Sequence, residues 1–197
     1  MKTVILEGKD FNRLIQATKA FISKTDRRPI YHYIKLDVDA ESKRVTAAAC
    51  DGYRLSVERA KAYEANENFS VYIFPISKQP AKSFVTIELH EKDVLIRCGE
   101  RIFGCRQPKC AEGFLDYEKF FSEETTFRVG FNPKLLKDAL AAAEASVGNV
   151  MAPLIFEFKS PSTPCFIKTG GKRENLKMVL PVRISDGVNC ASAEGDA

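Results

Sequence analysis

The sequence is poor in residues that bind metals or act as nucleophiles. It has two histidines, His32 and His90, and six cysteines, none of them in a C-x-x-C pair. Neither histidine stands at metal-ligand spacing from a cysteine, so no metal site is expected. No serine has a histidine partner in a nucleophile-like motif. These shortages argue against an enzyme, and we expect no cofactor.

Two motifs that could suggest chemistry have simpler explanations. Asp51 could serve as a general base, but a two-residue hairpin turn explains Asp51-Gly52, because both residues tolerate positive φ. The run Gly170-Gly171-Lys172 lacks the spacing of a phosphate-binding loop and the helix that follows one. It also indicates a turn.

Long apolar runs are missing as well. No segment reaches the roughly 18 apolar residues of a membrane-spanning helix, and the apolar part of the first seven residues is too short for a signal peptide. We therefore expect a cytoplasmic protein with reduced cysteines and no membrane partner. At 197 residues the chain can form one large domain or two small ones.

A large charge excess is absent too. The chain has 30 basic and 26 acidic residues, and its net charge of +4 does not by itself predict nucleic-acid binding. The distribution of charge is more informative. A helix expected from about Asp10 to Ser23, with Asp10 as N-cap, has an apolar stripe of Phe11, Leu14, Ile15, Thr18, Phe21 and Ile22. Its opposite face carries Asn12, Arg13, Gln16, Lys19, Ser23 and Lys24 and no acid. Such a face attracts phosphates, but a merely soluble helix face explains the same pattern.

The chain also contains a repeated unit of one strand, one helix and several further strands, which indicates an α+β fold with antiparallel sheets. The first repeat is expected to have a strand at 3–7, a helix at 10–23 and strands at 31–38, 44–49 and 53–59. The second has a strand at 69–74, a helical turn at 77–83 and strands at 84–89, 93–97 and 101–106. The third has a strand at 126–131, a helix at 133–147 and strands at 154–159, 165–168 and 176–183.

The sequence predicts the third helix more strongly than the second. Pro80 lies inside 77–83 and limits that segment to about one turn. The helix at 133–147 has Asn132 as a cap and Pro133 in its first turn. Its core face is expected to be Leu135, Leu136, Ala139, Leu140 and Ala143. Its outer alanines would permit close approach of a large partner, but they also simply favour helix.

Three segments in this order resemble a known family. They are the helix at 11–18 (FNRLIQAT), the hairpin at 45–57 (VTAAACDGYRLSV) and the strand at 176–184 (LKMVLPVRI). They are similar to the "RLIEAT"-like helix, the "TDGHRLA"-like hairpin and the "VMPMRL"-like C-terminal strand of the β subunit of bacterial DNA polymerase III, the sliding clamp. The run at 113–117 resembles the "G-x-F-P-D-Y"-like link of that family, with Leu115 at the proline-like position and Tyr53 at the histidine-like one.

The resemblance implies a DNA-clamp-like α+β fold of repeated βαβββ units, with antiparallel sheets and helices on one face. Residues 1–121 would be one clamp-like domain of two units, residues 122–184 half of a second domain, and residues 185–197 a disordered tail. It also implies a bacterial, phage or mobile-element origin and a non-catalytic role, at most as an accessory subunit of a DNA polymerase.

The resemblance further implies non-specific binding of double-stranded DNA along the basic helices. The expected DNA-binding residues are Arg13, Lys19, Lys24, Arg27, Arg28, Lys78, Lys82, Lys134 and Lys137. A shortened second helix would weaken any DNA channel.

A pocket for short peptides from DNA polymerase and other replication or repair proteins is implied as well. Its expected residues are Gly52, Tyr53, Arg54, Leu55, Leu115, Lys119, Phe120, Met178, Val179, Leu180, Pro181, Val182, Arg183 and Ile184. Packing in the core explains Leu180 and Ile184 equally well.

Two functions follow as hypotheses. The first is a clamp-like processivity or tethering factor that recruits proteins through the pocket and needs a homo-oligomer to form a ring. The alternative is a stand-alone clamp-fold interaction module, an adaptor or a decoy, that does not encircle DNA. A clamp fold without any replication role is the third option, since a fold does not determine function.

Overall fold

The computed structural model describes residues 1–25, 28–109, 113–121, 125–147, 152–169 and 175–184. The chain forms two compact units, Met1–Glu118 and Lys119–Ala197. The expected domain bounds, 1–121 and 122–184, stay a proposal. The expected disordered tail at 185–197 and the expected turn at 170–172 both lie outside the described residues. Among the described residues, no helix is both long and apolar enough to cross a membrane.

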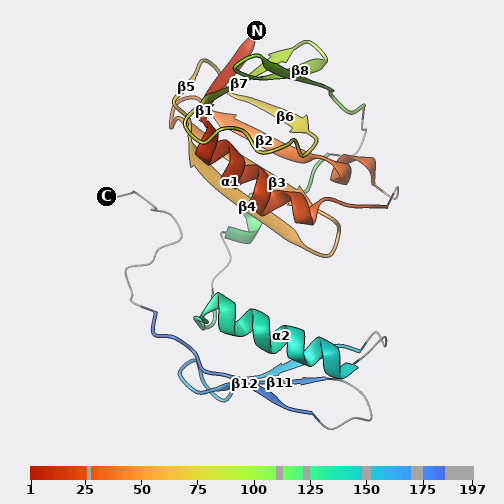
Figure 1. Cartoon of the computed structure of the whole chain (residues 1–197), viewed down its shortest axis with the longest axis vertical. Helices are drawn as coiled ribbons and strands as arrows, with labels where there is room; N and C mark the ends of the chain where they lie inside the picture. Colours follow the sequence, from red (N-terminus) through yellow and green to blue (C-terminus); the bar gives the residue numbers. More distant parts are fainter. Residues whose placement is uncertain (26–27, 110–112, 122–124, 148–151, 170–174, 185–197) are drawn as a thin grey trace. The chain divides into compact units, whose positions relative to one another are not determined.

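Unit 1 contains one α-helix and nine strands within its described part (Figure 1). In chain order these are β1 (Lys2–Glu7), α1 (Gly8–Thr18), β2 (Ile34–Asp39), β3 (Arg44–Cys50), β4 (Leu55–Lys61), β5 (Glu64–Ala65), β6 (Phe69–Ile73), β7 (Phe84–His90), β8 (Asp93–Cys98) and β9 (Arg101–Arg106). Short 3₁₀ turns lie at Lys19–Phe21, Pro29–His32 and, at the boundary with unit 2, Glu118–Phe121.

The strands of unit 1 form two antiparallel sheets, in the orders β5-β1-β7-β8-β9 and β4-β3-β2-β6. The two repeats exchange their first strands. The first repeat's β1 pairs with β7 of the second repeat, with Val4 opposite Ile87. The second repeat's β6 pairs with β2 of the first repeat, with Val71 opposite Leu36. Neither sheet is therefore complete without a strand from the other repeat.

The core of unit 1 lies between these sheets and under α1. Side chains that alternate along the strands point inward, as in β2, where Ile34, Leu36 and Val38 are buried. The helix adds Phe11, Leu14 and Ile15, which are almost completely buried. Burial of one such side chain stabilises the fold by about 1.5–3 kcal/mol. The expected apolar stripe is confirmed for Phe11, Leu14, Ile15 and Thr18. The expected helix end at Ser23 was wrong, because α1 ends at Thr18, before Phe21 and Ile22.

Unit 2 contains α2 (Pro133–Val147) and a three-stranded antiparallel sheet of β10 (Leu154–Glu157), β11 (Cys165–Thr169) and β12 (Lys177–Val179), in that order. The helix packs on β11 and β12 (Figure 1). Asn132 caps it, because its Oδ1 atom accepts a hydrogen bond from the backbone N–H of Lys134 at 3.0 Å. The core of this unit is Ala143, Cys165, Ile167 and Val179.

The α+β class and the antiparallel sheets agree with the sequence, but several segments differ. The first helix begins at Gly8, and its N-cap is Glu7. Asp10 lies inside the first turn. The reason is tertiary: the Gly8 and Lys9 N–H groups donate to the carbonyls of Ser83 and Ala81, at 2.7 and 3.0 Å. A Cβ atom on Gly8 would lie 2.0 Å from the Pro80 oxygen, so glycine is required there.

Five further predictions were wrong. Residues 77–83 form no helix, since Pro80 and the contact with α1 hold them in an irregular path. Residues 31–33 lie in or beside a 3₁₀ turn instead of a strand. Residues 126–131 form a single bridge, Gly130 to Val182, and the last strand is limited to Lys177–Val179. Leu135 is exposed rather than in the core.

Candidate functional site

The outer face of α1 is less uniformly basic in the structure than the sequence of the helix predicts. Arg13 is exposed, but its Nη1 atom lies 2.9 Å from Oε2 of Glu58 on β4. Its Nη2 atom donates to the Arg59 carbonyl at 2.7 Å and lies 3.7 Å from the Asp10 carboxylate. An acid from another strand therefore offsets this charge, which the helix sequence alone could not indicate.

Asn12 was expected on the same outer face, and that prediction was wrong. Its side chain is buried, and its Nδ2 and Oδ1 atoms bind the carbonyl and the N–H of Gln79, each at 2.8 Å. This pair holds the 76–83 segment against α1. Lys78 and Lys82, which the segment carries, consequently lie near the N-terminal part of the helix.

The other candidate DNA-binding residues are on the surface. Lys19, Lys24, Lys78 and Lys82 in unit 1, and Lys134 and Lys137 in unit 2, are exposed and have no ion pair within the described residues. Arg28 is exposed, and its guanidinium lies 5.7 Å from the ring centre of Tyr31. Arg27 lies outside the described residues.

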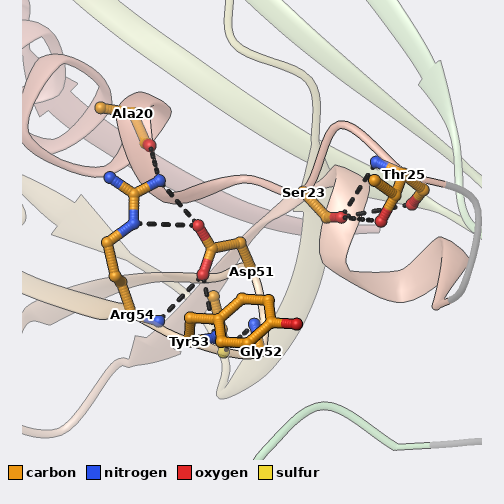
Figure 2. A network of polar contacts seen from close by, with 8 residues as sticks. Ala20, Ser23, Thr25, Asp51, Gly52, Tyr53 and Arg54 are labelled. Carbon is orange, nitrogen blue, oxygen red and sulfur yellow. Dashed lines mark hydrogen bonds and ion pairs between the residues drawn. The ribbon is translucent and has the colours of Figure 1, made fainter. Parts of the chain in front are cut away.

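The Asp51-Gly52 hairpin is wider than the two-residue turn expected. Cys50 pairs with Leu55, so four residues form the loop. Oδ1 of Asp51 accepts hydrogen bonds from the N–H groups of Tyr53 and Arg54, at 3.0 and 2.9 Å (Figure 2). Gly52 has φ +89°, a conformation that favours glycine. Tyr53, the next residue, is 93% exposed at the tip.

Arg54 connects this loop to the 3₁₀ turn Lys19–Phe21 that follows α1 (Figure 2). Its Nε and Nη2 atoms donate to Oδ2 of Asp51 at 3.0 and 2.7 Å, and Nη2 also donates to the Ala20 carbonyl at 3.1 Å. The hydrogen bond from Arg54, followed by those from the backbone, lowers the pKa of Asp51. Arg54 is therefore engaged within unit 1, whereas the side chain of Tyr53 is almost fully exposed.

Two further candidate residues are part of a small packed cluster in unit 1. Leu55 and Leu115 pack against Ile30, Tyr31 and Cys50. The link that carries Leu115 is anchored by Tyr117, whose hydroxyl donates to Oδ2 of Asp37 at 2.6 Å. For these two leucines the structure favours a packing role.

In unit 2, the candidate residues divide into a buried one and several exposed ones. Val179 is buried in the core, whereas Met178, Leu180, Val182 and Ile184 are exposed. Of these exposed residues, Val182 and Ile184 line a cleft of about 660 Å³. Its lining is Arg128, Gly130, Pro161, Ser162, Pro181, Val182, Arg183 and Ile184. Sequence reasoning missed the first four of these, because no motif marks them. Lys119 and Phe120 are exposed.

The described residues contain no group of three or more His, Cys, Asp or Glu side chains that could hold a metal ion.

The comparisons with known proteins agree with this fold. The family model described as DNA polymerase III beta subunit, central domain, matches residues 5–107, which run from β1 through β9. The chain belongs to the DNA polymerase III beta subunit family. The family resemblance expected from the three sequence segments is thus confirmed. The family is that of a non-catalytic subunit, in agreement with the expectation that the chain is not an enzyme. No curated protein matches the chain.

Solved structures of the beta subunit family share the fold. One is a protein from Eubacterium rectale described as a DNA polymerase III beta subunit, with a TM-score of 0.80 and 12% identity over 92% of this chain and 50% of that one. A DNA polymerase III beta chain from Streptococcus pneumoniae gives 0.74 and 18%, over 93% and 50%. The DNA polymerase sliding clamp from Bacillus subtilis gives 0.66 and 15%, over 93% and 64%. The chain thus spans about half the length of the first two.

Proposed function

We propose that this protein is a sliding-clamp-like tethering factor, which associates with duplex DNA without sequence preference and recruits replication or repair proteins through short peptides. The family match over residues 5–107 is the observation that carries the proposal. The exposed lysines near both ends of α1, which have no ion pair in the described part of the chain, support it, because binding to the DNA backbone requires exposed cations.

The DNA-binding part rests on Lys19, Lys24, Lys78 and Lys82 in unit 1 and on Lys134 and Lys137 in unit 2, with Arg27 and Arg28. Arg13 contributes less than its position on α1 suggests, since Glu58 holds its guanidinium. Each lysine that meets a phosphate releases a counterion, so the affinity should fall steeply as salt is raised.

The test is fluorescence anisotropy of a labelled duplex of arbitrary sequence, titrated at several salt concentrations. The double variant Lys19→Glu with Lys24→Glu should bind more weakly and reduce the salt slope by about two, one for each lost phosphate contact. Lys61→Glu with Lys92→Glu is the matched control, with the same change in charge at exposed positions elsewhere in unit 1. An equal loss in both variants, or in neither, would contradict the proposed surface.

The peptide-binding part rests on the exposed apolar residues of unit 2. Leu180, Val182 and Ile184 follow β12, and the latter two line the cleft beside Arg128 and Gly130. A cleft that combines apolar side chains, such as Val182 and Ile184, with two arginines, Arg128 and Arg183, suits an extended peptide with leucine or phenylalanine anchors. So small a contact should give micromolar affinity, about −8 kcal/mol.

Leu180→Ala tests this part, by titration calorimetry with a ten-residue peptide that carries leucine and phenylalanine anchors. Leu176→Ala is the control, because Leu176 is an equally exposed leucine just before β12. Tyr53→Ala is a separate arm, since the family resemblance also assigns Tyr53 to peptide binding. We expect Leu180→Ala to weaken binding about tenfold and Leu176→Ala to leave it unchanged. Equal affinities for all variants would refute the assignment.

The alternative function is a clamp-fold interaction module that binds peptides but not DNA. The pairing of Arg13 with Glu58 favours it, because this pair removes one cation from the surface expected to face DNA. Salt-independent or undetectable DNA binding, together with retained peptide binding, would select this alternative.

A further inference from the structure

Two large aromatic side chains lie beside each other on the surface of unit 1. Tyr63 is 62% exposed and Phe84 is 50% exposed, and their ring centres are 4.9 Å apart with an angle of 54° between the ring planes. Tyr63 directly precedes β5 and Phe84 is the first residue of β7, and these two strands lie on opposite sides of β1. The fold therefore brings together two rings that are far apart in the sequence.

Neither ring is part of the core of unit 1. Val85 and Ile87 are buried, so alternation along β7 places Phe84 on the other face of the strand. The backbone at Tyr63 is fixed, because its N–H donates to the carbonyl of Ile5 at 2.8 Å. Adjoining exposed aromatic rings on a fixed backbone are typical of a binding surface, since a partner that covers them removes apolar area from water.

The charge next to the rings is mainly positive. Lys61 and Lys82 each lie two residues before one of the rings. Lys43 is close as well, because its carbonyl accepts a hydrogen bond from the N–H of Ala62, the residue before Tyr63, at 2.7 Å. All three lysines are exposed, and none of them has an ion pair within the described residues. They can therefore contact an anionic partner.

Two acids lie in the same region, and one of them is neutralised. Glu7 is opposite Phe84 in the pairing of β1 with β7, and its Oε2 atom lies 3.0 Å from Nζ of Lys9. Glu64, directly after Tyr63, is exposed. The three lysines outweigh this acid and leave an excess of positive charge around the rings, which favours a partner with repeated negative charges.

We propose that Tyr63 and Phe84 form a stacking site for single-stranded DNA, whose phosphates contact Lys61 and Lys82. Aromatic rings stack on the flat faces of unpaired bases, and lysines beside them attract the backbone. The bases of a duplex are already stacked within the helix, so the site selects single strands. The match to a DNA polymerase subunit points to DNA as the nucleic acid. A peptide anchor needs a pocket that encloses it, whereas a base needs only the open ring face that exposures of 62% and 50% provide.

This site is distinct from the two surfaces proposed above. Ser83, next to Phe84, accepts the hydrogen bond of Gly8 at the start of α1, whereas the Asp51-Gly52 hairpin is joined to the turn after the end of α1. The rings and the hairpin thus lie near opposite ends of the helix. Lys82 is the residue that the site shares with the surface proposed for duplex DNA. The stacking site therefore does not depend on duplex or peptide binding.

The test is fluorescence anisotropy of a labelled oligothymidylate of about 12 nucleotides, which forms no duplex with itself. Tyr63→Leu and Phe84→Leu each remove a ring but keep an apolar side chain, so each should weaken binding about tenfold, the effect of one lost base stack. Tyr63→Phe keeps the ring and should bind like the wild type. Tyr53→Leu, the same change at another exposed tyrosine of unit 1, is the matched control and should also bind like the wild type. Urea unfolding checks that every variant is folded.

An abasic oligonucleotide of the same length gives a readout that does not depend on the variants. It keeps the phosphates and lacks the bases, so the wild type should bind it about as weakly as the double variant Tyr63→Leu with Phe84→Leu binds oligothymidylate. Lys61→Gln should lower the salt slope by about 0.7, the value for one phosphate of a single strand. The double variant should bind a duplex like the wild type, which separates this site from the surface on α1.

Four results would overturn the proposal. Equal affinities of the wild type and Tyr63→Leu for oligothymidylate would mean that the rings do not stack on bases, as would undiminished binding of the abasic oligonucleotide. Tighter binding of an oligouridylate of the same length would exclude DNA as the preferred ligand. Loss of peptide binding in Tyr63→Leu, with oligonucleotide binding unchanged, would assign the rings to a protein partner.

Discussion

The side chain of Asn12 and the backbone of Gln79 bind each other through two hydrogen bonds of 2.8 Å, across 67 residues of chain. The pair is buried and connects α1 of the first repeat to the segment between β6 and β7 of the second repeat. Asn12→Ala would leave the Gln79 N–H and carbonyl without partners, which costs about 1–3 kcal/mol for a buried group. We expect urea unfolding to show that loss. Gln16→Ala, at an exposed position of the same helix, should change the free energy of unfolding by less than about 0.5 kcal/mol. Equal stabilities of the two variants would contradict a role for the pair.

Because of Tyr117, the free energy of unfolding should decrease as pH rises in the alkaline range. Burial, and then its hydrogen bond to Asp37, raises the pKa of Tyr117 above its ordinary value. A raised pKa in the folded state means that this stabilisation is complete below about pH 10, the ordinary tyrosine value, and is lost as pH rises above it. Tyr117→Phe should lower stability at pH 7 by about 1 kcal/mol and flatten the decline above pH 10.

Urea unfolding at pH 7, 9 and 10.5 checks the Tyr117 prediction. Tyr53→Phe, the same chemical change at an exposed tyrosine, should leave both the stability and its pH dependence unaltered. A wild-type protein with the same stability at pH 9 and 10.5 would argue against the prediction.

Asp51 should contribute stability in the opposite pH range. The hydrogen bond from Arg54 lowers the pKa of Asp51, so the carboxylate stabilises the folded state above the ordinary value near 3.9. The contribution is lost as pH falls through the lowered pKa of the folded protein. Asp51→Asn should reduce stability at neutral pH and remove part of the acid sensitivity. Thermal melts between pH 7 and 3 measure this. Glu64→Gln, an exposed carboxylate in the same unit, should keep the wild-type profile.

Glu58→Gln should strengthen DNA binding, because it removes the acid that holds Arg13 at 2.9 Å. Freeing one cation and removing one negative charge should raise the affinity a few-fold at low salt and steepen the salt dependence by about one. Anisotropy titrations at two salt concentrations measure both effects. Glu41→Gln makes the same change of net charge at an exposed turn, and it should raise the affinity less. Tighter binding by both variants to the same degree would mean that net charge alone matters.

Local patterns in the sequence were sufficient for much of the fold. The residues of α2 were predicted at 133–147, the bounds observed, because Asn132 and Pro133 mark its start and the spacing of apolar residues determines its length. Strands β3, β7, β8 and β9 were predicted to within one residue, since alternation and turn residues mark short antiparallel strands. The wrong predictions at residues 77–83 and 126–131 concern segments whose path depends on distant partners.

For the candidate site, the sequence by itself determined which residue types are available: basic side chains on two helices, a hairpin with glycine at its turn and apolar residues after β12. Only the tertiary structure decided which of them are accessible. It paired Arg13 with Glu58, buried Asn12 against Gln79, engaged Arg54 with Asp51 and left Tyr53 exposed. It also decided that the first strand of each repeat of unit 1 belongs to the sheet of the other repeat. The physical reason is that periodicity and capping act over a few neighbouring residues, whereas ion pairs, burial and strand exchange join residues that are far apart in the chain.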